Sequence, residues 1–472
     1  MGGMRLVAGA AVLALATALP GAATRVFADT IESALVRSYQ SNPQLNAQRA
    51  SVRATDESVP QALSGYRPKV AITTSGGFQH NDFSVTQGLP SQGLVGNIQA
   101  QLKGDRTPVA YGATVSQTLF DGFQTANKTR AAEGQVSASR EGLRVLEQTV
   151  LLAAATIYMD YLRDSAIVEV QRSNVRVLEE TLKQTRDRFN VGEVTRTDVA
   201  QSEAQLAAGR TQLMAAESNL TTTRANYRRI VGNEPGQLAP GSPVDRFLPA
   251  TLSAAVDLGL IQNPNVTAAM YGIDVSHLQV KVAEGALFPN VSLQANVQQS
   301  YNQQLTVPSQ LIASAIAQVT VPIYQGGAEY SLIRQSKETL AQQRLTLELV
   351  RTQARASVVQ AWGQLVATKL QVQSAQAQVE ASEIAVNGIR EEAKAGQRTT
   401  FDVLVAQQTL VTARVALVTA QHDRVVASYA VLNAVGRLSP QVLKLNTTVY
   451  DPSVHYHQVR DSWGGMRTPD GQ

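Results

Sequence analysis

The sequence has no cysteine at all. The protein therefore forms no disulfide bond, offers no thiol for catalysis, and has no residue on which an N-terminal lipid anchor could be built. After the N-terminal region, no run of 18 consecutive apolar residues occurs. This absence excludes a helical inner-membrane protein, but it does not exclude a β-barrel, because barrel strands are short and alternate in polarity.

Signals for an enzyme are also missing. No glycine-rich loop followed by Lys-Ser or Lys-Thr is present, so the chain has no recognisable means of using ATP. Of the five histidines only His455 and His457 are close together, and a lone His-x-His in a polar tail is a weak metal signal. We therefore expect no catalytic site, no cofactor and no metal.

The first 28 residues have the pattern of a secretory signal peptide. A basic segment ends at Arg5, an apolar run of 14 residues follows, and small residues lead to the expected cleavage site after Ala28. Cleavage at Ala22-Ala23 is the alternative. Loss of this segment, with Arg5 and Arg25, lowers the formal charge from +4 to about +2, so nucleic acid is not a favoured partner.

The remaining chain is a tandem duplication. Asn42-Pro43 recurs 221 residues later as Asn263-Pro264, and further along the offset between matching motifs falls to 204. The extra residues of the first half lie within 79–106, a stretch rich in Gly, Ser, Gln and Asn that we predict to be a long exposed loop. The pairs at the second offset are Leu119-Phe120-Asp121-Gly122 with Ile323-Tyr324-Gln325-Gly326, Gly192 with Gly396, Asp198 with Asp402, and Val231-Gly232 with Val435-Gly436.

Each half contains a proline-free stretch of well over 100 residues, rich in helix-forming residues. Apolar and small residues recur there at alternating spacings of three and four, which is typical of the seam of a coiled coil. One such run consists of Val175, Leu178, Leu182, Thr185 and Phe189. Each stretch breaks once, at Gly192 and at Gly396, where we expect the chain to turn back. The helix predicted over 124–189 is about 100 Å long at 1.5 Å per residue.

Four segments alternate apolar with polar residues, at 69–78, 109–116, 290–298 and 313–323. Strands of this kind suit the wall of a transmembrane barrel, although any single one also fits a half-buried soluble sheet. Four strands cannot close a barrel, and an open edge is not tolerated in lipid. Symmetry would supply the partners, since three chains give twelve strands above twelve helical columns.

The chain resembles the TolC family of outer-membrane efflux proteins over nearly all of its mature length. The resemblance is carried by the duplicated Asn-Pro openings, the Pro-led strands, and two Gly-x-x-Thr-x-x-Asp turns at 192–198 and 396–402. It implies a mainly α-helical homotrimer with a 12-stranded β-barrel in the outer membrane and an α-helical tunnel through the periplasm. It also implies contact with outer-membrane lipid, a periplasmic adaptor, and an ABC-type or proton-driven inner-membrane pump.

This organisation divides the chain into five parts. After the signal peptide (1–28) come a first repeat (29–232), a linker in an equatorial collar (233–250), a second repeat (251–436) and a C-terminal collar and tail segment (437–472) whose end we expect to be disordered.

The resemblance places the periplasmic entrance of the tunnel at the two glycine turns, Gly192 and Gly396. Carried over by position, Thr197 and Asp198 lie on one coil, and Arg398 and Asp402 lie on the other. An Arg–carboxylate contact between coils is a reasonable latch.

An alternative role for these turns is helix capping, by Thr195 and Asp198 in one and by Thr399 and Asp402 in the other. Two departures from the family latch stand nearby: Ala393 replaces a tyrosine, and Val405 replaces an acidic residue.

The leading hypothesis is a passive conduit for drug efflux or type I polypeptide secretion, which the residues do not separate. The second hypothesis, from a different class, is a periplasmic coiled-coil scaffold without a pore. The scaffold explains the helices but leaves the four alternating strands without a lipid face.

Overall fold

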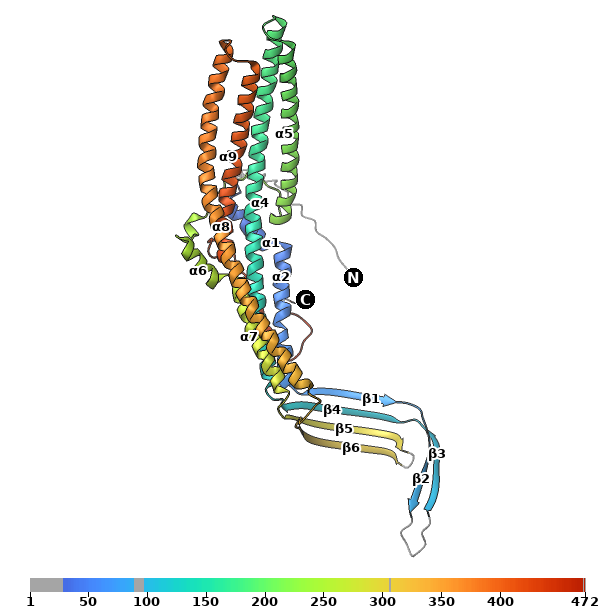
Figure 1. Cartoon of the computed structure of the whole chain (residues 1–472). Coiled ribbons are helices and arrows are strands. Elements are labelled where there is room, and N and C mark those ends of the chain that lie inside the picture. Colours follow the sequence, from blue (N-terminus) through green and yellow to red (C-terminus); the bar gives the residue numbers. More distant parts are fainter. Residues whose placement is uncertain (1–28, 89–96, 305–306, 470, 472) are drawn as a thin grey trace, which may run out of the picture.

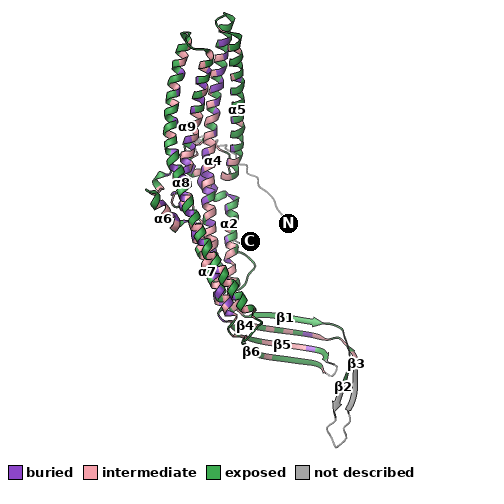
Figure 2. Cartoon of the chain, viewed as in Figure 1, coloured by how far each residue is buried: buried purple, intermediate pink, exposed green. Residues whose placement is uncertain are grey.

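The computed structural model describes residues 29–88, 97–304, 307–469 and 471, so the predicted signal peptide lies outside the described residues. The molecule is elongated, with paired long helices at one end and β-strands at the other (Figure 1). Buried residues concentrate along the helices, whereas the strands whose burial is described are mostly exposed or half-buried (Figure 2).

Two antiparallel helix pairs form the long part of the molecule. They are α4 (Gln124–Asn190) with α5 (Arg196–Val231), and α8 (Ala328–Lys394) with α9 (Thr400–Val435). The longer helix of each pair has 67 residues, about 100 Å at 1.5 Å per residue. The predicted rods, and the turns at Gly192 and Gly396, are therefore confirmed.

The predicted seams hold each pair together. Val175, Leu178 and Leu182 of α4 are buried against α5, and Val386 of α8 is buried against α9. Phe189, which the spacing placed in the seam, is instead exposed, because it lies in the last turn of α4 where the seam ends.

Helix α9 has the length and composition of a membrane-spanning helix, although polar residues interrupt its apolar runs. It packs along α8 and contacts α4 and α5. Its apolar residues serve this packing, since 12 of them are buried.

The shorter helices continue the coils where α5 and α9 end. Helices α1 (Ile31–Ser41), α2 (Pro43–Asp56) and α3 (Ser58–Leu63) pack on α4, and α7 (Pro264–Gly285) lies between α4 and α8. The Asn-Pro pairs begin these helices in both halves: Asn42 and Asn263 accept backbone hydrogen bonds at 2.9 Å, and each following proline needs no donor.

A core at mid-length joins the two halves. Leu35 of α1, Tyr158 of α4 and Leu432 of α9 meet Val244 of the linker and Leu438 of the C-terminal segment. Here α6 (Leu252–Gln262) packs on α8 and α9, and the 3₁₀ turn η2 (Asp245–Phe247) lies in the linker. The linker and the start of the C-terminal segment thus lie beside the middle of the coils.

The sheet has four antiparallel strands in the order β1-β4-β5-β6. These are β1 (Lys69–Gly76), which follows the 3₁₀ turn η1 (Ser64–Tyr66), with β4 (Val109–Phe120), β5 (Asn290–Gln304) and β6 (Val307–Thr320). All four were predicted from alternation. The order pairs the two halves through β4 and β5, and among the described strands it leaves one side of β1 and one side of β6 without a partner.

The expectation of a loop at 79–106 was wrong for the described residues of that stretch: β2 (Gln79–Gly88) and β3 (Asn97–Arg106) pair in register as a ribbon beyond the sheet (Figure 1). Its polar composition misled the prediction, because backbone pairing needs no apolar face where a strand covers no core. Helix α10 (Ser453–Val459) lies near the start of the tail and packs on α2, and the disorder expected at the end of the tail stays a prediction.

Candidate functional site

The register of the sheet sorts its side chains into two faces. One row across the four strands consists of Ile72, Ala113, Val297 and Ala313, and the adjacent row on the same face of Val70, Val115, Ala295 and Ala315. Val297 is 53% exposed although it lies in an inner strand. A sheet with an uncovered face made of Val, Ile and Ala is built to contact something apolar.

The opposite face is mostly polar. Its rows include Ala71, Thr114, Asn296 and Ser314, and Thr73, Gly112, Gln298 and Ile312. Hydroxyl and amide groups dominate, and Ser314 donates a hydrogen bond to Asn296 across the strands. Lys69, at the helical end of β1, is the charged residue of these four strands. This face of the sheet is therefore hydrophilic and nearly uncharged.

At the far end of the molecule, both glycine turns carry complete capping boxes. Asp198 Oδ2 accepts from the Thr195 backbone N–H at 2.8 Å and from the Thr195 hydroxyl at 2.7 Å, and the Asp198 N–H donates back to Thr195 Oγ1. Thr399 and Asp402 repeat the arrangement at 2.9 and 2.8 Å. The capping alternative is therefore confirmed in both turns.

These hydrogen bonds set the ionisation of the two carboxyl groups. The Thr195 hydroxyl and then its backbone N–H lower the pKa of Asp198, and the Thr399 backbone N–H and then its hydroxyl lower the pKa of Asp402. Both aspartates are therefore charged at neutral pH. Thr197 is exposed and takes no part in the box.

Arg398 does not pair with Asp198 within this chain. Its Nε donates to Glu392 Oε2 at 2.9 Å, inside its own turn. The first repeat has a similar local pair, Arg188 Nε to Glu193 Oε2 at 2.9 Å. Within one chain, a carboxylate six residues away therefore satisfies Arg398 without bridging the coils, and the latch between coils stays a prediction.

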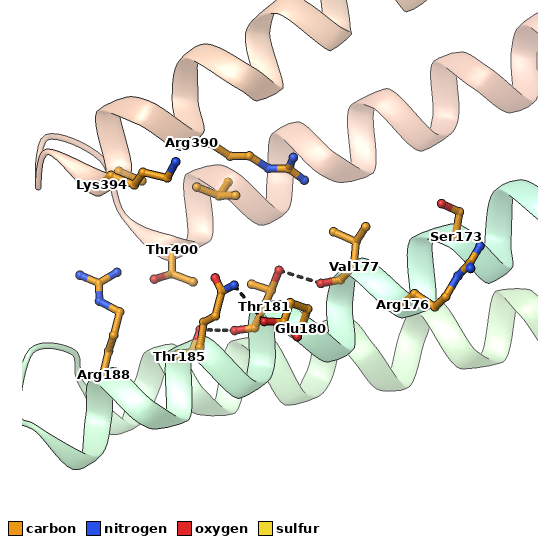
Figure 3. Close-up of a pocket in the computed structure, with 13 residues that line it drawn as sticks. Ser173, Arg176, Val177, Glu180, Thr181, Thr185, Arg188, Arg390, Lys394 and Thr400 are labelled. Carbon is orange, nitrogen blue, oxygen red and sulfur yellow. Dashed lines mark hydrogen bonds between the residues drawn. The ribbon is translucent and has the colours of Figure 1, made fainter.

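The two coils are loosely joined near these tips. A cavity of about 550 Å³ separates them, lined by Val177, Thr181 and Arg188 from α4 and by Arg390 and Lys394 from α8 (Figure 3). Ala393, where the family latch has a tyrosine, also lines it. The small side chain of Ala393 leaves part of the cavity open that a tyrosine ring at this position would occupy.

Polar contacts that the sequence did not reveal join helices both between the two coils and within one of them. Between the coils, Gln205 Nε2 donates to Gln408 Oε1 at 3.3 Å. Within the second coil, Arg390 donates to Gln407 at 3.1 Å and Arg414 pairs with Glu383 at 2.7 Å. In the sequence, such a contact could be predicted only from a polar residue at a seam position. Gln407, which is buried, is one example.

A buried histidine bridges the coils nearer the middle. His422 of α9 lies 3.0 Å from Asp160 of α4 through Nε2 and 2.8 Å from Asp423 through Nδ1, and Arg163 pairs with Asp160 at 2.8 Å. Burial by itself lowers the pKa of His422. The hydrogen bonds to the two aspartates raise it by more than burial lowers it, so the pKa lies above its usual value. His422 is thus suited to carry a positive charge between two acids.

Comparison with known proteins decides the family. Residues 34–233 and 255–437 match the family model described as outer membrane efflux protein. The chain belongs to this family. It is 39% identical over 464 residues to the outer membrane efflux protein BepC of Brucella suis biovar 1 (strain 1330), covering 98% of this chain and 97% of that one.

Other similarities extend to secretion proteins and solved channels. The alkaline protease secretion protein AprF of Pseudomonas aeruginosa is 25% identical over 344 residues, 70% of each chain. The crystal structure of the Campylobacter jejuni CmeC outer membrane channel matches with a TM-score of 0.74 at 16% identity, covering 91% of this chain and 89% of that one. This member of the outer membrane efflux protein family is thus an outer-membrane protein with the fold of solved outer-membrane channels, as its resemblance to the TolC family predicted.

Proposed function

We propose that three copies of this chain close a 12-stranded barrel and act as a passive conduit across the outer membrane and periplasm. The observation that carries the proposal is the amphipathic sheet with two unpaired edges among the described strands. Lipid does not tolerate an open edge, and rotation about a threefold axis brings β6 of one copy beside β1 of the next. The apolar rows would then face lipid and the polar rows the pore.

The conduit would take its energy from partners. The sequence contains no glycine-rich phosphate loop, so transport must be driven by an inner-membrane pump, of the ABC or proton-driven type, linked through a periplasmic adaptor. The chain itself would supply a wettable channel and no chemical step.

We propose that the glycine turns form the periplasmic entrance, where Gly192 and Gly396 reverse the coils. Thr197, Asp198, Arg398 and Asp402 would then act between protomers. Arg398 is exposed and held by a single carboxylate in its own turn, so a neighbouring acid can replace that partner at little cost. The cavity between the coils would leave the tips room to move.

Two substrate classes fit this conduit. Small-molecule efflux is favoured by BepC, which carries efflux in its name, and polypeptide secretion by AprF, named for protease secretion. The higher identity and fuller coverage of BepC favour efflux as the first candidate. A periplasmic scaffold without a pore remains the competing class, and it predicts no conductance.

Single-channel conductance in planar bilayers tests the conduit, with protein purified from outer membranes and its mass checked for a trimer. We expect stable pores of low conductance that open further in Arg398→Ala and Asp198→Asn. Asparagine keeps an oxygen that can cap α5, so this change removes the charge and spares the helix start. Arg196→Ala, in the first turn of α5, is the matched control and should leave conductance unchanged.

The outcomes separate the claims. A trimer that conducts but ignores both changes keeps the channel and refutes the latch between protomers. A water-soluble protein that never inserts refutes the barrel and supports the scaffold.

A further inference from the structure

The C-terminal tail reaches the base of the sheet. Helix α10 is held by His455, whose Nδ1 lies 3.1 Å from the buried Asp56 of α2, and by Tyr456, whose hydroxyl is 3.4 Å from Glu133 of α4. After α10 ends, Arg67 Nη1 donates to the Ser462 carbonyl at 2.5 Å. The tail is thus fixed at both ends of the segment that leads to Trp463.

Trp463 is placed where the helical part meets the strands. The guanidinium carbon of Arg67 lies 4.8 Å from the centroid of the Trp463 ring, and Arg67 stands two residues before β1. The ring is nevertheless 74% exposed, and the nearby Met466 is fully exposed. Arg67 therefore covers only a small part of the ring, and two large apolar side chains of the tail stay uncovered by the described part of the chain.

Every strand of the sheet has an exposed aromatic residue at the same end. Tyr66 precedes β1, Phe123 follows β4, Phe288 precedes β5 and Tyr324 follows β6. In membrane proteins Trp and Tyr are enriched at the boundary between the hydrocarbon core and the lipid headgroups, because their rings have an apolar body and a polar group. In an outer-membrane channel this end of the strands faces the periplasm.

We propose that the tail segment Asp461–Gly465, followed by Met466, is an interfacial anchor that inserts Trp463 into the periplasmic leaflet of the outer membrane. The partner is the phospholipid headgroup region. Arg67 lies against the ring and can form an ion pair with a lipid phosphate, while the indole enters the boundary between the headgroups and the hydrocarbon core. With no cysteine for lipidation, each protomer gains a second attachment to the bilayer besides its strands. The inference rests on the proposed barrel, whose position defines the leaflet.

The chain suits a fluorescence test, because it contains only two tryptophans, Trp362 and Trp463. Trp362→Phe leaves Trp463 as the one reporter; Trp362 is partly buried in the α8–α9 core, away from the sheet. The full-length trimer is reconstituted into phosphatidylcholine vesicles whose acyl chains are brominated either near the headgroup or near the methyl end. We expect Trp463 to lose most of its fluorescence to the shallow bromines and less to the deep ones.

A second variant separates this inference from the barrel. Val297→Trp, in a background of Trp362→Phe and Trp463→Phe, places a reporter on the apolar face of the sheet, where the flanking residues are alanines. In the proposed barrel this reporter lies deeper in the bilayer than Trp463, because Val297 is in the interior of β5. Quenching by deep bromines in Val297→Trp together with shallow quenching of Trp463 supports both proposals.

The remaining outcomes each refute one claim. If Val297→Trp is quenched but Trp463 responds only to aqueous acrylamide, the tail is solvated and the anchor is refuted. If Trp463 responds to neither quencher, a neighbouring protomer covers it and the anchor is again refuted. If Val297→Trp is not quenched by lipid, the barrel proposal fails, whatever Trp463 shows.

Discussion

The capping box of the first glycine turn gives a sharp test of what holds the tip of the coil. Thr195→Val keeps the β-branched shape of the side chain but removes the hydroxyl, which accepts from the Asp198 N–H and donates to the Asp198 carboxylate. Helix α5 should still form, because its packing against α4 is unchanged. Only its first turn should open more often.

The size of the effect follows from the value of an N-cap. Replacing a Thr cap costs about 1 kcal/mol, and the first turn of α5 is exposed, so little packing compensates for the loss. With RT near 0.59 kcal/mol, this cost raises the opening constant of the turn about fivefold. The rest of the 36-residue helix should not respond, because a cap acts within one turn.

Amide hydrogen exchange measures this opening directly. In Thr195→Val, the amides of the first turn of α5 should exchange about fivefold faster, whereas those in its middle should keep their rates. Thr197→Val is the matched control, because Thr197 is an exposed threonine of the same turn that stands outside the box. An unchanged rate at Asp198, or equal acceleration in the control, would refute the reasoning.

Three further predictions concern the middle of the molecule. The pKa of His422 is raised on folding, so its bridge stabilises fully below about pH 6.5 and weakens as pH rises through the folded pKa. His422→Gln should therefore flatten the decline of the thermal midpoint above about pH 6.5, and the exposed His277→Gln should not. Tyr158→Phe removes a hydroxyl that lies 2.7 Å from the Asp29 carbonyl oxygen and 2.6 Å from that of Ala239, and should lower the free energy of unfolding by about 1–3 kcal/mol, seen as a lower denaturant midpoint with an unchanged slope. Gly436→Ala should cost more than Gly192→Ala in the same assay: both positions have positive φ, worth about 1–2 kcal/mol of strain, but only at Gly436 would a Cβ lie 2.6 Å from backbone atoms.

Much of the fold could be predicted because its signals are local. Helix periodicity, the absence of proline, and strand alternation each act over a few residues, and they predicted the long rods and all four strands of the sheet. The same holds for the two glycine turns, since Thr195 and Thr399 cap helices that begin one residue later. Composition failed in the ribbon β2–β3, whose strands are held by backbone pairing and exposed ion pairs rather than by an apolar face.

The sequence by itself determined the repeats, the rods, the turns and the amphipathic strands of this protein. Only the tertiary structure decided which distant residues meet. It set β4 beside β5 and brought Trp463 to Arg67. Periodicity and capping depend on neighbours within a turn or two, whereas these pairings depend on where whole elements come to lie, and many pairings are compatible with the same local pattern.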